Sequence, residues 1–198
     1  MRNGIIIGVI LLVGLGLVYW SNMPKEKPHD LPILNPIDID ISVVDPEMLR
    51  IGQGHTISDF KLQNQEGKWI TRKEVEGKVY VAEYFFTTCG TICPIMTVQM
   101  ERVAERFKGN SEVKILSFTV DPDTDDVTQM AQYAKSHNAN PNQWYFLTGD
   151  KSELYSLARK SFFLLKPAEA QNLGDAGSDF IHTNNFVLVD KMGRIRGY

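Results

Sequence analysis

The feature that most constrains this chain is an abrupt change of hydrophobic pattern at two cysteines. Residues 78–87, KVYVAEYFFT, form a β-branched and aromatic run, which predicts a buried strand that leads to Cys89. After Cys93 and Pro94, apolar side chains recur at spacings of four, three and four residues, which is typical of one face of an amphipathic helix. The members of that face are Met96, Met100, Val103 and Phe107. A strand, a cysteine-bearing turn and a helix therefore follow one another directly.

The rest of the domain repeats this alternation of strands and helices. Residues 113–120 and 144–147 are apolar runs that predict strands, and an amphipathic pattern follows each of them. The helix after residues 113–120 is marked by Val127, Met130, Ala131 and Ala134. The helix after residues 144–147 is marked by Leu154, Leu157, Ala158 and Ser161. Residues 186–189 and 194–198 predict a closing hairpin around a turn that contains Gly193. The pattern indicates an α/β domain with a parallel βαβ core, to which the hairpin adds antiparallel strands.

Two segments precede this core. Residues 23–50 form a proline-rich tether, because prolines at this density prevent a helix and favour an extended spacer. Within the tether, residues 37–44 alternate enough to predict an added edge strand. Residues 57–62 and 68–71 flank a glycine-containing turn at residues 64–67 and predict an N-terminal hairpin.

Residues 4–20, GIIIGVILLVGLGLVYW, form an uncharged apolar run of 17 residues. As a helix this run would be about 25 Å long, slightly short of a hydrocarbon core of about 30 Å. Tyr19 and Trp20 stand at its end, where interfacial aromatic side chains are expected. A cleaved signal peptide is the alternative, but the run is longer than an ordinary signal-peptide core and no A-x-A cleavage site follows. We therefore predict a single transmembrane helix within residues 1–22, which anchors the chain to a membrane.

Charge and cysteine content narrow the classes of function. The formal net charge of −3 indicates no broad basic surface for nucleic acid. The chain has 2 cysteines, which excludes a disulfide-stapled miniprotein and a four-cysteine zinc site. We expect the folded domain to span residues 51–198. Because the chain stops in or just after a strand with no terminal helix, we also expect a sequence truncated at its C-terminus.

The cysteine turn is the strongest indication of chemistry. Cysteines near a helix N-terminus feel the positive end of the helix dipole, which favours the thiolate, the form that acts as nucleophile and as metal ligand. A C-x-x-C pair is typical of disulfide exchange, whereas three residues separate Cys89 from Cys93. Residues four apart share one face of a helical turn, so both sulfurs can point at one ion, and two thiolates suit Cu(I) above all. The flanking glycine and threonine argue against deep burial of the pair.

Two thiolates need a third ligand, and His182 is the candidate. It follows a loop rich in glycine and aspartate and precedes the last apolar strands. In a thioredoxin-like sheet, the start of that strand lies beside the N-terminus of the first helix, where an imidazole would complete a set of two sulfurs and one nitrogen. The alternative is a loop histidine with an ordinary hydrogen bond, and for a histidine without a cysteine pair nearby that alternative would be preferred.

Other polar or sulfur-containing residues are assigned lesser roles. Met96 and Met100 are expected to pack in the core because of their helical spacing. The segment 121–124, DPDT, lines the site or caps the next helix, and capping is the expectation. Among the other histidines, His55 and His137 have no partners in the sequence, and His29 lies in the tether, so none of these is assigned a role.

With these motifs in view, the chain resembles the SCO/SenC family of copper-binding assembly factors. Four segments within residues 54–198 carry the resemblance: GHTISDFKLQNQEG, YFFTTCGTICPIMT, TVDPDTD and IHTNNFVLVDKMGRIRGY. The resemblance implies a thioredoxin-like fold and a copper ion, Cu(I) or Cu(II), bound by Cys89, Cys93 and His182. The aspartate of the family's Asp-Pro motif falls on Asp121. The chain departs from the family at Gly90, where members often have proline, and in lacking the C-terminal helix.

The resemblance also implies a function and partners. It implies maturation of the dicopper CuA centre of cytochrome c oxidase by an extracytoplasmic, membrane-anchored protein. Its partners would be the copper-bearing oxidase subunit and a copper donor protein. The first hypothesis is therefore a metallochaperone, which is not a classical enzyme.

The alternative function is a thiol–disulfide oxidoreductase. In this hypothesis Cys89 and Cys93 cycle between dithiol and disulfide and keep the cysteines of the oxidase copper site reduced. Thioredoxins place a cis-proline before the strand that faces their cysteines, whereas this chain has no proline after Pro167. A peroxidase of the peroxiredoxin type shares the fold, but the sequence does not show the arginine and threonine that would activate Cys89 toward peroxide.

Overall fold

The structure is a computed structural model that describes residues 13–16, 30–164 and 184–198 of the 198-residue chain. The chain divides into two units, residues 1–31 and residues 32–198. In the first unit, residues 13–16 are helical. Among the described residues, no helix has the length and apolar character needed to cross a membrane. Most of the predicted anchor and His182 lie outside the described residues.

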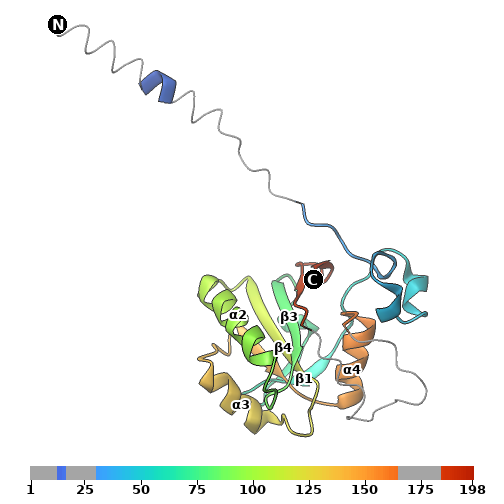
Figure 1. Cartoon of the computed structure of the whole chain (residues 1–198), viewed down its shortest axis with the longest axis vertical. Coiled ribbons are helices and arrows are strands. Elements are labelled where there is room, and N and C mark those ends of the chain that lie inside the picture. The colour runs from blue at the N-terminus through green and yellow to red at the C-terminus, as the bar shows by residue number, and fades with distance from the viewer. Residues whose placement is uncertain (1–12, 17–29, 165–183) are drawn as a thin grey trace, which may run out of the picture. The chain divides into compact units, whose positions relative to one another are not determined.

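The second unit is built on a five-stranded mixed sheet with the order β5-β4-β3-β6-β7 (Figure 1). Strands β3 (Val79–Phe85), β4 (Val113–Thr119) and β5 (Trp144–Leu147) run parallel to one another. Strand β6 (Val187–Val189) pairs antiparallel with β3, and β7 (Ile195–Gly197) pairs antiparallel with β6. The predicted parallel core and closing hairpin are both confirmed.

Three helices connect and cover these strands (Figure 1). Helix α2 (Cys93–Arg106) joins β3 to β4, α3 (Val127–Ser136) joins β4 to β5, and α4 (Lys151–Lys160) follows β5. Their buried faces carry the predicted apolar residues Met96, Met100, Met130, Ala134, Leu154, Leu157 and Ala158. Two residues assigned to these faces are exposed instead, Ala131 and Phe107, because Tyr133 takes the inward position on α3 and Phe107 lies beyond the end of α2.

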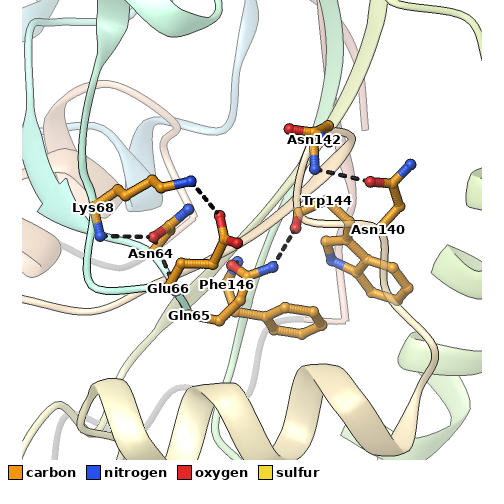
Figure 2. Close-up of polar contacts among 8 residues, drawn as sticks. All are labelled: Asn64, Gln65, Glu66, Lys68, Asn140, Asn142, Trp144 and Phe146. Atoms are coloured by element: carbon orange, nitrogen blue, oxygen red, sulfur yellow. Dashed lines mark hydrogen bonds and ion pairs between the residues drawn. The ribbon is translucent and has the colours of Figure 1, made fainter.

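The predicted N-terminal hairpin is confirmed as β1 (Lys61–Gln63) and β2 (Trp69–Thr71). It extends the edge of the main sheet, since the backbones of Gln63 and Thr148 exchange hydrogen bonds of 2.8 and 2.9 Å. The side-chain amide of Gln65 then takes the place of a strand beside β5. It donates to the carbonyl of Trp144 at 2.7 Å and accepts from the N–H of Phe146 at 3.0 Å (Figure 2). These contacts satisfy backbone groups that an edge strand would otherwise present for association.

The edge strand predicted for residues 37–44 is wrong. This segment forms short 3-10 helices, η1 (Pro36–Asp38) and η2 (Ile41–Val43). The carboxylate of Asp40 accepts from the backbone N–H of Ser42 at 2.9 Å, and such local side-chain bonds favour turns over a sheet ladder. The sheet is instead met by Leu34, whose N–H donates to the carbonyl of Ile195 at 2.9 Å.

The two faces of the sheet differ in composition. Because side chains alternate along a strand, residues 80, 82 and 84 of β3 face the opposite way from residues 81, 83 and 85. The face beneath α4 is apolar and rich in aromatic rings, with Phe118 at its centre. The face beneath α2 and α3 contains the second apolar cluster, which includes Cys89 and Cys93. This cysteine face also carries the buried polar side chains Glu83, Ser117 and Thr119.

Candidate functional site

The cysteine turn lies at the carboxyl end of β3, where the chain passes into α2. The N–H of Cys89 donates to the carbonyl of Phe86 at 3.2 Å, which closes a turn directly after the strand. Cys93 is the first residue of α2, and Pro94 occupies the second position, where its missing N–H removes no intrahelical bond. The end of the buried strand and the start of the helix thus place Cys89 in the loop after β3 and Cys93 in the first turn of α2.

The expectation that the cysteines avoid deep burial is wrong. Cys89 is 8% exposed and Cys93 is 3% exposed, and both are free thiols within the second apolar cluster. Gly90 and Thr91 take the exposed positions of the turn, so the turn directs its polar residues outward and its sulfurs inward. The apolar side chains that pack against this cluster include Phe86, Ile92 and Phe186.

The two thiols have different acidities. Burial acts to raise the pKa of Cys89, but hydrogen bonds from the Cys93 thiol, from the backbone of Cys93 and from Thr91 outweigh it and lower the pKa to about 7. The Sγ of Cys89 lies 3.6 Å from the hydroxyl of Thr91. Burial raises the pKa of Cys93 to about 12, aided by its hydrogen bond to Cys89 and by the charges of Cys89 and Glu83. The pair therefore loses its first proton near neutral pH, and Cys89 is the thiol that ionises first.

The loop after β4 lies against the cysteine turn. The N–H of Val120 donates to the carbonyl of Phe85 at 2.9 Å, which joins the ends of the two strands. Asp121, the aspartate assigned from the family motif, is half-buried in this loop, and its N–H donates to the hydroxyl of Thr119 at 2.8 Å. The sequence offers helix caps at residues 121–126, and the cap is supplied by Asp126, whose carboxylate accepts from the N–H of Gln129 at 2.8 Å, and not by residues 121–124.

Sequence reasoning missed Asp125. Its side chain is fully buried and accepts hydrogen bonds from Thr87, in the cysteine turn, and from Thr119, at the end of β4. The sequence shows Thr87 two residues before Cys89, and Asp125 four residues after Asp121. Their pairing cannot be inferred from this spacing, because it depends on β3 and β4 being neighbours in the sheet.

The methionines of α2 and the histidines His55 and His137 have surroundings that the structure describes. Met96 and Met100 are buried in the core, as predicted. His55 is a buried histidine whose Nε2 lies 2.8 Å from the carbonyl of Ser161, and burial lowers its pKa. His137 lies 2.7 Å from the carboxylate of Glu101. The described part of the chain contains no group of three or more His, Cys, Asp or Glu side chains placed to hold a metal ion, and His182 lies outside it.

Comparisons with known proteins show similarity of sequence and fold to one family. The model of the SCO1/SenC family matches residues 50–198. A SCO1 protein homolog of Bacillus subtilis is 35% identical over 144 residues, which cover 71% of this chain and 72% of the relative. Among solved structures, BsSco, a member of the Sco family of cytochrome c oxidase assembly proteins in which a disulfide switch was identified, is 33% identical with a TM-score of 0.58. The match covers 71% of this chain and 80% of BsSco. Copper-bound ScoI of Arabidopsis thaliana is 28% identical with a TM-score of 0.54, over 70% of this chain and 83% of ScoI.

Proposed function

The chain belongs to the SCO1/SenC family, and on that premise we propose that Cys89, Cys93 and His182 bind copper for the assembly of cytochrome c oxidase. The observation that carries the proposal is the pair of adjacent thiols, one of which ionises near neutral pH. Thiolate sulfur is a preferred ligand of Cu(I), so the donor set fits this ion. Copper bound to ScoI of Arabidopsis supports the same cargo here.

The residues around the pair define how it would load and release copper. Cys89 ionises near neutral pH, and copper binding would displace the proton that Cys93 retains, because metal ligation requires deprotonated sulfur. The surrounding apolar side chains limit access of water to the sulfurs. A site of two sulfurs and one imidazole leaves one side open for ligand exchange with the oxidase subunit. The predicted tether and anchor would keep the domain near this membrane partner.

Competitive titration with Cu(I) tests this proposal. The full-length chain is reduced in detergent and titrated against a chromophoric Cu(I) chelator. We expect one tightly bound copper, and we expect Cys89→Ser and Cys93→Ser each to weaken binding by more than about 100-fold, since changes outside the ligand set already cost 10–100-fold. His182→Ala should weaken binding as well, whereas His137→Ala, which removes a histidine away from the turn, should leave it unchanged.

The same titration can contradict the proposal in two ways. A wild-type chain that binds no Cu(I) under reducing conditions rejects copper binding altogether. A His182→Ala variant that binds as tightly as wild type rejects His182 as a ligand and leaves a two-cysteine site.

The unequal acidity of the thiols favours a second function, thiol–disulfide exchange. The Cys89 thiolate would attack a disulfide of the partner and form a mixed disulfide, with one partner thiolate as the leaving group. Cys93 would lose its proton and attack the Cys89 sulfur, releasing the second partner thiolate. The pair would thus lose two electrons and the proton of Cys93, and the partner disulfide would gain the two electrons and be released as two thiolates, one of which can take that proton. The disulfide switch of BsSco supports this chemistry.

Trapping with oxidised glutathione distinguishes the roles of the two thiols. Cys93→Ser should accumulate a mixed disulfide at Cys89, because the second attack is removed. Cys89→Ser should be modified much more slowly near pH 7, because burial, the largest cause of the raised pKa of Cys93, persists in this variant. Equal modification of both variants would contradict the assignment of Cys89 as the nucleophile.

A further inference from the structure

We propose that Asp125 is a positioning residue that holds the cysteine turn in the geometry in which Cys89 and Cys93 meet. The hydrogen bonds of the Asp125 carboxylate go to Thr87 and Thr119, so it acts on the cysteines through Thr87, two residues before Cys89. The inference deepens the proposed copper site and rests on it for its functional meaning.

The contacts of Asp125 join three elements. Its carboxylate accepts from the backbone N–H of Thr87 at 3.1 Å, from the hydroxyl of Thr87, and from the hydroxyl of Thr119 at 2.6 Å. The amide of Gln129, on α3, donates to the hydroxyl of Thr87 at 3.0 Å. The backbone of Asp121 donates to the hydroxyl of Thr119 at 2.8 Å. The cysteine turn, the loop after β4 and helix α3 are therefore tied to one carboxylate.

The direction of these hydrogen bonds requires an acceptor at position 125. The Thr87 hydroxyl already accepts from Gln129, and the Thr119 hydroxyl already accepts from the backbone of Asp121, so each hydroxyl has its proton free to donate. An ionised carboxylate only accepts, and its two oxygens suit the three donors. An asparagine would present an NH₂ group to donors and leave at least one of these bonds unmade.

Burial of the Asp125 side chain is energetically unfavourable, so packing alone does not account for a carboxylate at this position. The residue is 0% exposed, and within the described residues no lysine, arginine or histidine forms an ion pair with it. Removing a carboxylate from water without a countercharge is unfavourable unless its hydrogen bonds compensate. Here the bonds converge on the residue that leads into the cysteine turn, which indicates that they order that turn.

The dithiol–disulfide equilibrium of the metal-free protein tests the inference. The full-length chain is equilibrated with reduced and oxidised dithiothreitol, where two electrons and two protons pass from the cysteines to oxidised dithiothreitol. Asp125 holds the turn so that the two sulfurs meet, which favours a bond between them, so Asp125→Asn should shift the equilibrium toward the dithiol by about tenfold. Thr87→Val should shift it in the same direction without any change of charge, and Thr87→Ser, which keeps the hydroxyl, should restore the wild-type value. Cu(I) affinity should fall in parallel.

Asp126→Asn is the matched control. It removes the same charge one residue along the chain, its asparagine oxygen can still accept from the N–H of Gln129 and cap α3, and it leaves the bonds of Asp125 to Thr87 in place. Its dithiol equilibrium should equal that of wild type. The inference is overturned if folded Asp125→Asn matches wild type, or if Asp126→Asn shifts the equilibrium equally. If Asp125→Asn fails to fold, the Thr87 variants decide, and equal values for Thr87→Val and Thr87→Ser reject the inference. A wild-type chain that binds no copper would contradict the proposed function. The dithiol–disulfide equilibrium, which is measured without metal, would still test the role of Asp125.

Discussion

The two faces of the central sheet are built on different principles. The face beneath α4 buries only apolar and aromatic side chains of β3, β4 and β5, including stacked Tyr84 and Phe118, whose ring centroids lie 5.1 Å apart. The cysteine face buries a carboxyl group at Glu83, whose Oε1 accepts from Ser117 at 2.6 Å. Ser117 in turn accepts from the indole N–H of Trp144 at 2.9 Å. One face is thus devoted to packing, and the other places polar groups near two thiols.

This difference locates stability and chemistry on opposite sides of one sheet. Apolar packing stabilises in proportion to the area removed from water, whereas a buried carboxyl group destabilises unless it is fully bonded. Among the described residues, Glu83 Oε2 has no hydrogen-bond partner. The cysteine face therefore holds groups that packing alone would not favour, as expected where a fold supports a reactive site.

The largest effect is expected from the apolar face. Phe118→Ala removes a fully buried ring that lies within 6 Å of the rings of Phe60, Tyr84 and Phe162. It should lower the free energy of unfolding by about 3–5 kcal/mol, because the cavity cannot fully collapse. Urea denaturation at constant m-value measures this change. A loss below about 1 kcal/mol would contradict the assignment of this face as the main source of stability.

The second-largest effect is the dependence of stability on pH that Glu83, on the cysteine face, should cause. Burial raises the pKa of Glu83 from 4.5 to about 7, although the hydrogen bond from Ser117 opposes the shift. Between these values the folded protein keeps a proton that the unfolded chain releases, so stability falls as the pH rises from 4.5 to 7 and levels off above it. The expected loss is about 3 kcal/mol. Denaturation at several pH values measures it, and Glu83→Gln, which cannot ionise, should remove this fall and leave the rise with pH that the lowered pKa of His55 causes. A fall that persists in this variant would assign it to other groups.

A smaller effect is expected from Ser117, which connects two partners on the cysteine face. Ser117→Ala removes the donor to Glu83 and the acceptor of the Trp144 indole. It should lower stability by about 1–3 kcal/mol, since buried polar groups lose their partners. The pKa of Glu83 should rise further, which extends the fall of stability to higher pH. An unchanged pH profile would show that the hydrogen bond does not control the carboxyl group.

The smallest effect is expected at Gly90, in the exposed part of the cysteine turn. Gly90 has no positive φ, and a Cβ built there meets no atom within 4 Å. Gly90→Ala should therefore stabilise the chain by about 0.4–1 kcal/mol by restricting the unfolded state. Thermal denaturation measures this gain. Gly109→Ala is the contrasting control, because its φ of +78° strains an alanine and should destabilise.

The fold was predictable where periodicity was decisive. The run at residues 78–87 and the pattern from Met96 to Met100 report strand and helix directly, because their burial follows the local repeat. The strand predicted for residues 37–44 was wrong, because the aspartates among the alternating aliphatic residues there form local hydrogen bonds with the backbone. The burial of the cysteines and the role of Asp125 were not predictable, because both depend on contacts between segments distant in the sequence. Thr87 and Asp125 are 38 residues apart.

X-ray absorption at the copper edge tests the copper site most directly. The Cu(I)-loaded, reduced full-length chain should show a first coordination shell of two sulfur atoms and one nitrogen atom. His182→Ala should lose the nitrogen contribution and retain both sulfurs. A first shell without sulfur in the wild-type chain would contradict copper binding by Cys89 and Cys93.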